Sequence, residues 1–256
     1  MASAVFTLTL TILGVCYQKD VRDNRNEPPA TRMAVLVADL SSIQQNPALS
    51  PAVLSLSAAA IGPTGVMTSF RAFTPADLNR FAKCNLDPLT ETYDIGFYLQ
   101  YYAKWPSLFQ VAVDDMGNIL GYIMGKTESS PDYFKHSKHY LPWHAHITAL
   151  TVAPEARRLG IGRILTEKLE AGANAADAWF VDLFVRKSNE KAIRFYENMG
   201  YSVYRVVKDY YGDNVNDPTA TGEDAYDMRK PMKRDKALNH IRDDGRNHEV
   251  QPEDVF

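Results

Sequence analysis

The chain has 256 residues, of which 45% are hydrophobic and 23% are charged, and its net charge is −3. This length allows one or two domains with a sizeable core. The mild acidity argues against a dedicated nucleic-acid binder, which is usually strongly basic. Only two cysteines occur, Cys16 and Cys84, which excludes a disulfide framework and a cysteine-rich metal site and favours a reducing compartment. The histidines show no metal-ligand spacing, so no metal is expected.

Residues 1–66 differ in composition from the rest of the chain. Residues 1–15 are apolar, but no Lys or Arg precedes them and the run is too short for a membrane span. The residues that follow lack a clear period, and we interpret 1–66 as a poorly ordered extension. Met67 would be a natural initiator, so this extension is also compatible with a wrongly assigned start. An organelle presequence is the competing interpretation, which the arginines of residues 20–32 favour and their acidic residues weaken.

The predicted domain covers residues 67–232 and begins with a strand over 68–73. Thr74 is then a good N-cap, Pro75 fits the first helical position, and Asp77 stands where a capping-box acid is expected. A second helix is predicted over 96–104. The loop between the two helices carries several polar groups and an aromatic side chain.

The next segments alternate between strands and helices. Strands over 108–113 and 119–126 form a predicted hairpin, and a long connection at 128–142 leads to a strand over 144–152. A helix after residue 160 ends near 172–174, and a buried strand covers 179–185. A helix starting at 188–190 and two strands, over 201–207 and 226–228, complete a mixed α/β sheet. Residues 233–256 are charged without a sustained apolar face, which predicts a flexible tail.

A basic turn with two glycines follows the strand over 144–152. Such a turn directs backbone N–H groups and the positive end of a helix dipole into one small volume, which suits a diphosphate. Gly160 and Gly162 let a phosphate approach the backbone, and the arginines add positive charge. The spacing excludes a P-loop, because Arg163 and Ile164 follow Gly162, and Leu165 replaces the last glycine of a dinucleotide fingerprint.

The remaining pattern, Arg/Gln-x-x-Gly-x-Gly/Ala, resembles the acetyl-CoA pyrophosphate loop of GCN5-related N-acetyltransferases (GNAT). The order of the predicted elements is similar to that fold. Further segments resemble the catalytic subunits of NatB N-terminal acetyltransferases, and the resemblance covers about residues 67–232. It departs from the family in the leader and in the longer connection at 128–142. The segments that carry the narrower resemblance are 87–93, 97–101, 121–126, 180–186 and 224–230.

The resemblance implies a mixed, mostly antiparallel sheet with helices on both faces and a splayed strand pair that binds acetyl-CoA. The pantetheine arm would pair with Leu150, Thr151 and Val152, and the N–H of Val152 would stabilise the oxyanion of a tetrahedral intermediate. Asn189 and Tyr196 match a second cofactor element, in which Tyr196 donates a proton to the leaving thiolate. The alternative for Tyr196 is a tyrosine that only packs on the sheet. The diphosphate would rest on Arg157, Arg158, Leu159, Gly160, Ile161, Gly162 and Arg163.

The family acetylates the initiator Met of nascent chains when Asp, Glu, Asn or Gln follows, by direct attack in a ternary complex. An α-amino group titrates at about 7.7–8.0, so a histidine suffices as base. His146 is the candidate, and His144 is a rival on the same strand face. A structural histidine is the alternative for either. Glu91 would repel an acidic second residue, so we expect it to set loop geometry or to contact the peptide backbone or the amine. The expected peptide-binding residues are Glu91, Tyr93, His146, Tyr210 and Tyr211.

The resemblance also implies a large helical-repeat auxiliary subunit that docks the enzyme on ribosomes, near nascent chains, in the cytoplasm. The helix pair over 78–104 is where exposed apolar positions are expected. Neither nucleic-acid readout nor a membrane is implied. Two alternatives stay open: a GNAT enzyme that acetylates a lysine side chain or small amine, and a non-catalytic adaptor of the same fold. Lysine titrates at about 10.4 and would need a stronger base.

Overall fold

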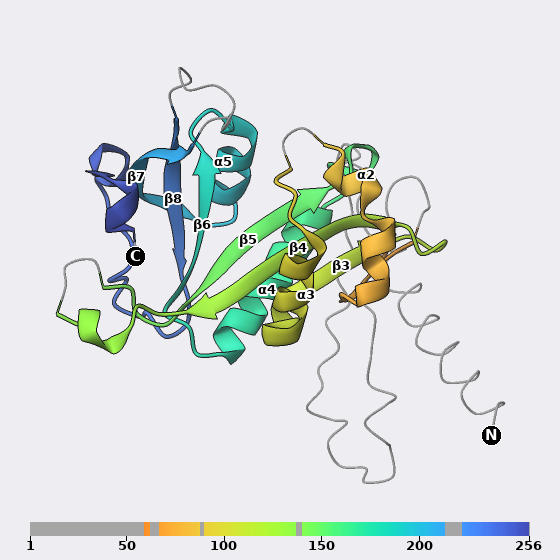
Figure 1. Ribbon diagram of the computed structural model, residues 1–256, viewed down its shortest axis with the longest axis horizontal. Coiled ribbons are helices and arrows are strands. Elements are labelled where there is room, and N and C mark those ends of the chain that lie inside the picture. The colour runs from red at the N-terminus through yellow and green to blue at the C-terminus, as the bar shows by residue number, and fades with distance from the viewer. Residues whose placement is uncertain (1–58, 62–66, 88–89, 137–139, 213–221, 256) are drawn as a thin grey trace, which may run out of the picture. The chain divides into compact units, whose positions relative to one another are not determined.

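The computed structural model describes residues 59–61, 67–87, 90–136, 140–212 and 222–255 (Figure 1). Within these residues the core is a nine-stranded mixed sheet with the order β1-β2-β3-β4-β5-β6-β8-β7-β9. Only the pairs β5–β6 and β7–β9 are parallel, so the predicted mostly antiparallel sheet is confirmed. The strands are β1 Ala59–Ile61, β2 Met67–Ala72, β3 Phe109–Val113, β4 Ile119–Glu128, β5 His144–Val152, β6 Phe180–Arg186, β7 Ser202–Tyr211, β8 Glu223–Pro231 and β9 Glu249–Val250.

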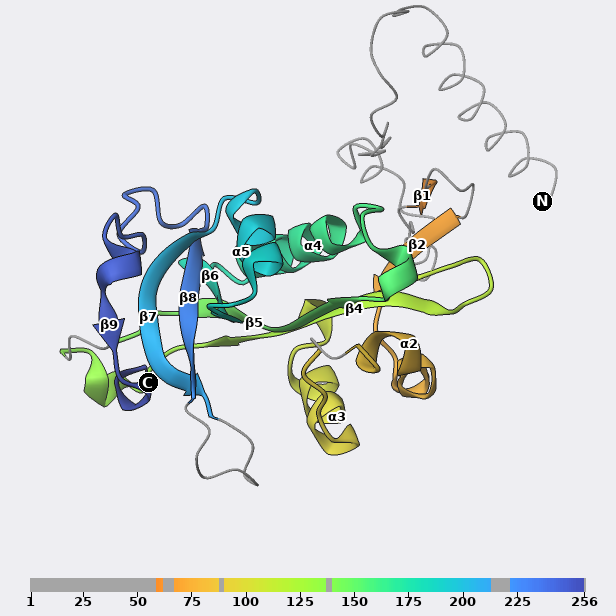
Figure 2. The same cartoon turned by 90° about the horizontal axis from the view of Figure 1, so that it is seen from above.

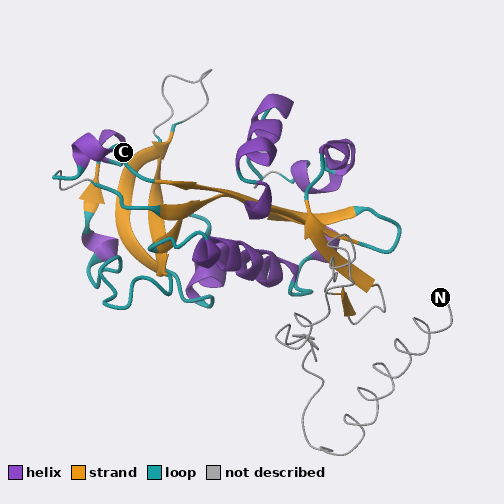
Figure 3. Ribbon diagram, turned by 90° about the horizontal axis from the view of Figure 1, so that it is seen from below, coloured by secondary structure: helices purple, strands orange, loops and turns teal. Residues whose placement is uncertain are grey.

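The helices cover both faces of the sheet, as predicted. Figure 2 shows α2 (Ala82–Asn85) and α3 (Ile95–Lys104) on one face, and α4 (Ile161–Ala175) and α5 (Glu190–Glu197) on the other. The same layers are visible from the opposite side in Figure 3. Gly125 allows α4 to approach β4 closely, because a Cβ there would lie 2.6 Å from Cδ1 of Leu169.

The predicted first helix is shorter and tighter than an α-helix. Its N-terminus is confirmed, since Thr74 and Asp77 form a capping box and Pro75 takes the first position. The segment Pro75–Arg80 is a 3₁₀ helix, however, and α2 adds only one α-helical turn. The buried carboxylate of Asp77 also pairs with Arg71 of β2, Nη2 to Oδ1 2.6 Å, which ties this helix to the sheet.

The expectation for the leader is almost entirely outside the described residues. Of 1–66, only Ala59–Ile61 are described, and they form β1, which pairs antiparallel with β2. Among the described residues, no helix is long and apolar enough to cross a bilayer.

Residues 233–255 pack against the sheet, which corrects the predicted flexible tail. Strand β9 pairs in parallel with β7, and the Val255 side chain is buried. The guanidinium of Arg205 donates to the carbonyls of Asp254 (3.4 Å) and Val255 (3.5 Å). Backbone pairing and a few contacts of single residues hold this segment on the sheet. Such packing does not need a periodic apolar face, which is why the sequence shows none.

Candidate active site

A cavity opens where two parallel neighbours in the sheet separate. Strand β5 pairs with β6 only at Ala145↔Val181 and His146↔Asp182, and beyond these residues the strands diverge (Figure 1). The space between them is a cavity of about 480 Å³, a size usual for small-molecule sites. The splayed strand pair predicted from the resemblance is therefore confirmed.

A β-bulge in β5 accompanies this divergence. Met124 pairs with Ala149 and Gly125 with Ile147, so Thr148 is an extra residue on β5. The Thr148 hydroxyl lies 2.9 Å from the hydroxyl of Tyr101 in α3, and its carbonyl accepts from the Tyr93 hydroxyl at 3.4 Å. Bulges increase local twist. Side chains from α3 and from the loop before it hold this bulge in place.

The open edge of β5 presents backbone donors and acceptors to the cavity. The N–H of Ala153 donates to the carbonyl of Leu120 in β4 at 2.9 Å. Because N–H groups alternate between the two edges of a strand, the N–H of Val152 points to the other edge, where β6 has moved away. This donor has the orientation expected for stabilising an oxyanion.

The two glycines of the turn after β5 have different structural roles. Gly160 has φ of 81° and is the N-cap of α4, a conformation that L side chains rarely adopt. Gly162 has no such constraint, and a Cβ there would lie 3.5 Å or more from Phe195 and Val152. The fold therefore has room for a methyl group at Gly162, and its absence leaves space for something outside the chain.

The guanidinium of Arg157 makes its polar contacts with other residues of the chain. Its Nε donates to the carbonyl of Val152 at 3.0 Å, and its Nη2 pairs with the buried carboxylate of Asp87. This arginine therefore stabilises the end of β5. Arg158 and Arg163 are exposed as well, and Nη1 of Arg163 lies 3.5 Å from Oε1 of Glu167 in α4.

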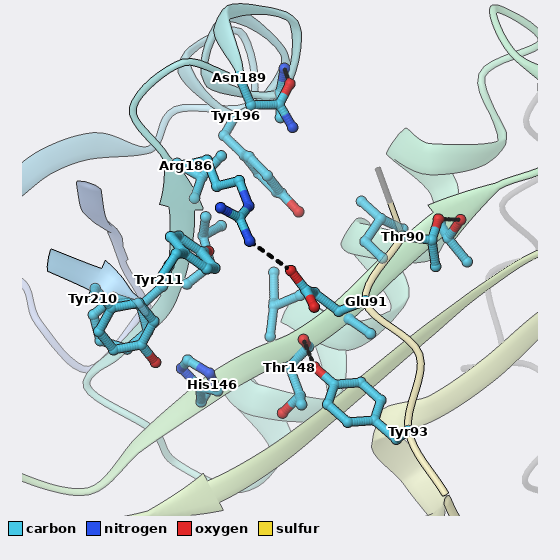
Figure 4. A pocket seen from close by; sticks show the side chains of 18 of the residues that line it. Thr90, Glu91, Tyr93, His146, Thr148, Arg186, Asn189, Tyr196, Tyr210 and Tyr211 are labelled. Atoms are coloured by element: carbon cyan, nitrogen blue, oxygen red, sulfur yellow. Dashed lines mark hydrogen bonds and ion pairs between the residues drawn. The ribbon is translucent and has the colours of Figure 1, made fainter. Parts of the chain in front are cut away.

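Tyr196 and Asn189 bring polar groups from α5 to the cavity. The Tyr196 hydroxyl points into the cavity (Figure 4) and has no hydrogen-bond partner among the described residues. Burial raises the pKa of this phenol, so it holds its proton at neutral pH. The Oδ1 atom of Asn189 caps α5 by accepting from the N–H of Ala192 at 3.2 Å, which leaves the Asn189 amide NH₂ as a donor.

His146 forms a dyad with a buried carboxylate. Its Nδ1 lies 2.9 Å from Oδ1 of Asp182. Burial by itself raises the pKa of Asp182, but His144, His146 and Arg229 together hold it well below its usual range. A charged carboxylate fixes the proton on Nδ1, so Nε2 of His146 is left as an acceptor. His144 is fully buried and binds the carbonyl of Pro142 through Nδ1, which removes it from the cavity.

An ion pair crosses the mouth of the cavity. Nη2 of Arg186 in β6 lies 3.2 Å from Oε1 of Glu91 in the loop before α3 (Figure 4). The same guanidinium stacks on Tyr211, 4.2 Å from its ring centre, and contacts Glu223 at 3.2 Å. Burial raises the pKa of Tyr210 to about 12, so this hydroxyl beside the mouth is a donor at neutral pH.

The chain is similar in sequence and fold to known proteins. Residues 78–201 match the Acetyltransferase (GNAT) family. The chain is 48% identical over 191 residues to the N-terminal acetyltransferase B complex catalytic subunit naa20 of Schizosaccharomyces pombe, covering 74% of this chain and 99% of that protein. The chain belongs to the family of NatB catalytic subunits.

Two solved structures of this family are similar to the chain. One is Naa20 of Chaetomium thermophilum in complex with a bisubstrate analogue, with 74% identity, a TM-score of 0.70, and coverage of 73% of this chain and 98% of that chain. The other is a NatB complex bound to a bisubstrate inhibitor, with 37% identity, a TM-score of 0.61, and coverage of 73% and 99%. Like other NatB catalytic subunits, the chain is an N-terminal acetyltransferase.

Nine of the residues predicted for the NatB site line the cavity, and they come from four separate segments; Val152 is not in the lining. The pyrophosphate-type turn of residues 157–163 does not line the cavity but follows directly at the end of β5. In the described part of the chain, no group of three or more His, Cys, Asp or Glu side chains is placed to hold a metal ion. The predicted residues that line the cavity are Glu91, Tyr93, His146, Leu150, Thr151, Asn189, Tyr196, Tyr210 and Tyr211.

Sequence reasoning missed three functional neighbours. Asp182 was detectable as a lone acid inside the apolar run 180–185, which is a signal for a buried paired charge. Arg186 stands at the end of that strand without a distinguishing pattern. Thr148 has its role only because a bulge shifts the register, and no local sequence feature marks that shift.

Proposed function

We propose that this chain transfers acetyl from acetyl-CoA to the α-amino group of proteins whose initiator Met is followed by Asp, Glu, Asn or Gln. Both substrates would be bound together, and the amine would attack the thioester directly. The observation that carries the proposal is the unpaired β5 edge, where the N–H of Val152 points away from β4, directly after Leu150 and Thr151, which line the cavity together with Tyr196. The bisubstrate complexes of the two related structures support a ternary arrangement.

Acetyl-CoA fits the open edge and the turn that follows it. The pantetheine amides would pair with Leu150 and Val152 as an added strand, because β6 does not pair with β5 there. The diphosphate would lie on the N-terminus of α4, where Gly162 provides space and Arg158 and Arg163 provide charge. Arg157 would support this site only by holding the end of β5.

The transfer needs one proton acceptor and one donor. The α-amino nitrogen attacks the acetyl carbonyl carbon, and the Val152 N–H stabilises the resulting oxyanion. The amine proton passes to Nε2 of His146, directly or through one water. When the C–S bond breaks, Tyr196 gives its proton to the thiolate, which is possible because its pKa is raised by burial. The products are an N-terminal amide and free CoA.

The polar groups at the mouth suit an acidic or amide second residue. The hydroxyls of Tyr210 and Tyr211 are donors for its side chain, and Tyr93 and His146 line the same cavity. The negative charge of Glu91 would oppose an Asp or Glu, but Arg186 neutralises it across the cavity. Glu91 would then shape the loop and remain available to the peptide amine.

A partner subunit is supported by apolar side chains on the α2–α3 layer. This surface lies on the face of the sheet away from α4 and α5 (Figure 2). Such a patch is typical of a protein interface, and we assign it to the auxiliary subunit of a NatB complex, which we expect to be a large helical-repeat protein that docks on ribosomes in the cytoplasm. The exposed residues are Leu86, Ile95, Leu99 and Tyr102.

The decisive experiment measures acetylation by the full chain assembled with its auxiliary subunit. Peptides that begin Met-Asp, Met-Leu and Ser-Glu, and one with a blocked N-terminus and an internal lysine, compete for acetyl-CoA. We expect the Met-Asp peptide to be acetylated at its α-amino group and the others to react far more slowly. Acetylation confined to the internal lysine would overturn the proposal. A complex that binds acetyl-CoA but modifies no peptide would favour the adaptor.

A further inference from the structure

A second cavity, of about 550 Å³, lies apart from the active site and shares no lining residue with it. Its walls come from the segment before β5, from Trp179 just before β6, from β7 and β8, and from the packed C-terminal segment 233–255. The active-site chemistry described above does not use it. The lining residues are Tyr140, Leu141, Pro142, Trp179, Tyr204, Arg205, Arg229, Asn239 and His240.

The described residues of the lining include two arginines and no carboxylate. Arg229 and Arg205 are almost fully buried and share the carboxylate of Asp227: Nε of Arg205 and Nη2 of Arg229 each lie 2.8 Å from its Oδ2. Asp182 stands opposite Arg229 in the register of β6 and β8, but it is bound to His146. Among the described residues, these two cations are therefore in direct contact with one carboxylate, that of Asp227, which is not part of the cavity lining.

One guanidinium nitrogen of this pair is free. Nε and Nη2 of Arg229 both bind Asp227, whereas Nη1 has no hydrogen-bond partner among the described residues. Nη1 is not among the buried polar atoms without a partner, so water that enters the cavity can reach it. A bound anion would replace that water with a charge-assisted hydrogen bond.

Aromatic rings surround the guanidinium. The guanidinium of Arg229 packs on the rings of Tyr204 and Phe180, with its Cζ 3.6 and 4.6 Å from the ring centres. The His240 ring lies 5.4 Å from that of Trp179, and Asp235 holds its Nδ1 at 2.8 Å, which directs Nε2 away from that carboxylate. Rigid, stacked arginines are well suited to planar anions such as carboxylate and phosphate.

We propose that this cavity binds a small organic anion, with its carboxylate or phosphate on Nη1 of Arg229 and a planar body beside Trp179 and His240. A cation would be repelled by the two arginines, and a wholly apolar ligand would leave Nη1 without an acceptor. The volume lies within the range of ordinary ligand sites.

The test uses the full chain with saturating CoA, so that the turn at 157–163 is occupied, and follows heat on titration with benzoate, phenyl phosphate or benzyl alcohol. We expect saturable binding of the two anions and binding of the alcohol weaker by about tenfold or more. Absence of saturable anion binding would overturn the proposal, as would an alcohol that binds as tightly as benzoate.

Substitutions test whether benzoate binds in this cavity. Arg229→Lys keeps the charge but loses the planar donor, and Asn239→Trp fills the cavity from an exposed position that tolerates substitution. Both should weaken benzoate by about tenfold or more, while Arg158→Gln in the turn should leave it unchanged. Acetylation of a Met-Asp peptide by Asn239→Trp confirms folding. Wild-type benzoate affinity in Asn239→Trp, or its loss in Arg158→Gln, would contradict the site.

Discussion

The Nδ1 atom of His146 lies 2.9 Å from Oδ1 of Asp182, a carboxylate that is only 3% exposed. This contact joins the cavity wall of β5 to the buried face of β6, at the last residue pair before the strands separate. The tautomer of the candidate base is therefore set by the same register that opens the cavity. Several expected outcomes depend on this and on neighbouring contacts.

Replacing Asp182 with Asn should lower kcat by about tenfold or more and leave the KM for acetyl-CoA nearly unchanged. The amide no longer fixes the proton on Nδ1 of His146, so a fraction of the imidazole loses its acceptor at Nε2. Steady-state kinetics with a Met-Asp peptide measures this. Asp182→Glu, which keeps the charge, should recover part of the rate. An equal loss in both variants would indicate a packing role alone.

The ionisation of Asp182 also makes stability depend on pH. Because the folded-state pKa of Asp182 is held below its unfolded value of about 3.9, the charged group stabilises the fold above about pH 4. That stabilisation is lost as pH falls toward the folded-state pKa. Urea unfolding between about pH 5 and pH 3 should therefore show a shallower loss of free energy in Asp182→Asn than in the natural chain. Equal slopes would contradict a depressed pKa.

Tyr196→Phe should lower kcat by about a hundredfold with little change in the KM for acetyl-CoA, since a proton donor to the leaving thiolate is lost. The raised pKa of Tyr196 predicts that the hydroxyl stays protonated above pH 10. The rate of the natural enzyme should not fall between about pH 8 and pH 10 through tyrosine ionisation. A descending limb in that interval that disappears in Tyr196→Phe would refute the assignment.

Substitutions at the two glycines of the turn should distinguish an effect on stability from an effect on phosphate binding. Gly162→Ala should keep the thermal midpoint, because the new methyl has 3.5 Å or more to Phe195 and Val152, and should weaken acetyl-CoA binding. Gly160→Ala should destabilise the protein by about 1–2 kcal/mol, since alanine is disfavoured at a φ of 81°. Calorimetric unfolding and acetyl-CoA titration distinguish the two. Unchanged affinity in Gly162→Ala would place the diphosphate elsewhere.

Arg186→Met should raise the KM for a Met-Asp peptide about two- to fivefold, because the charge of Glu91 is then uncompensated beside an acidic side chain. A Met-Asn peptide should be affected less. The double variant Glu91→Gln/Arg186→Met should restore the Met-Asp value toward that of the natural chain. The effect should weaken with added salt, because the pair is partly exposed. A double variant worse than Arg186→Met would show that Glu91 binds the peptide directly.

Removing residues 233–256 should lower the free energy of unfolding by about 2–4 kcal/mol, because β7 loses its pairing with β9, Arg205 loses two carbonyl acceptors and the buried Val255 side chain is lost. Chemical denaturation measures the difference. Lys236→Ala, an exposed change in the same segment, should have no effect. A truncated chain as stable as the full one would show that the packed segment does not contribute to stability.

The sequence predicted the parts of this protein that have a strong local signal. The strand over 144–152, the glycine turn and the helix beginning at 188–190 are found where periodicity and capping placed them. The packing of 233–255 was not predictable, because β9 is held by backbone pairing that any sequence can make. The partners of His146 were equally hidden, since Asp182 reaches it through sheet register, 36 positions away in the chain.

The extra residue at Thr148 limits how this site can change in evolution. Side chains alternate along a strand, so deleting one residue of β5 away from the bulge would turn the following residues over, and Leu150 and Val152 would exchange inward and outward positions with Thr151. Deleting Thr148 itself would keep their pairing with β4 but would remove the bulge and its contacts with Tyr101 and Tyr93. Replacements of single side chains can therefore alter peptide preference gradually. Insertions or deletions inside β5 cannot, and length variation should be confined to the connections outside it, such as 128–142.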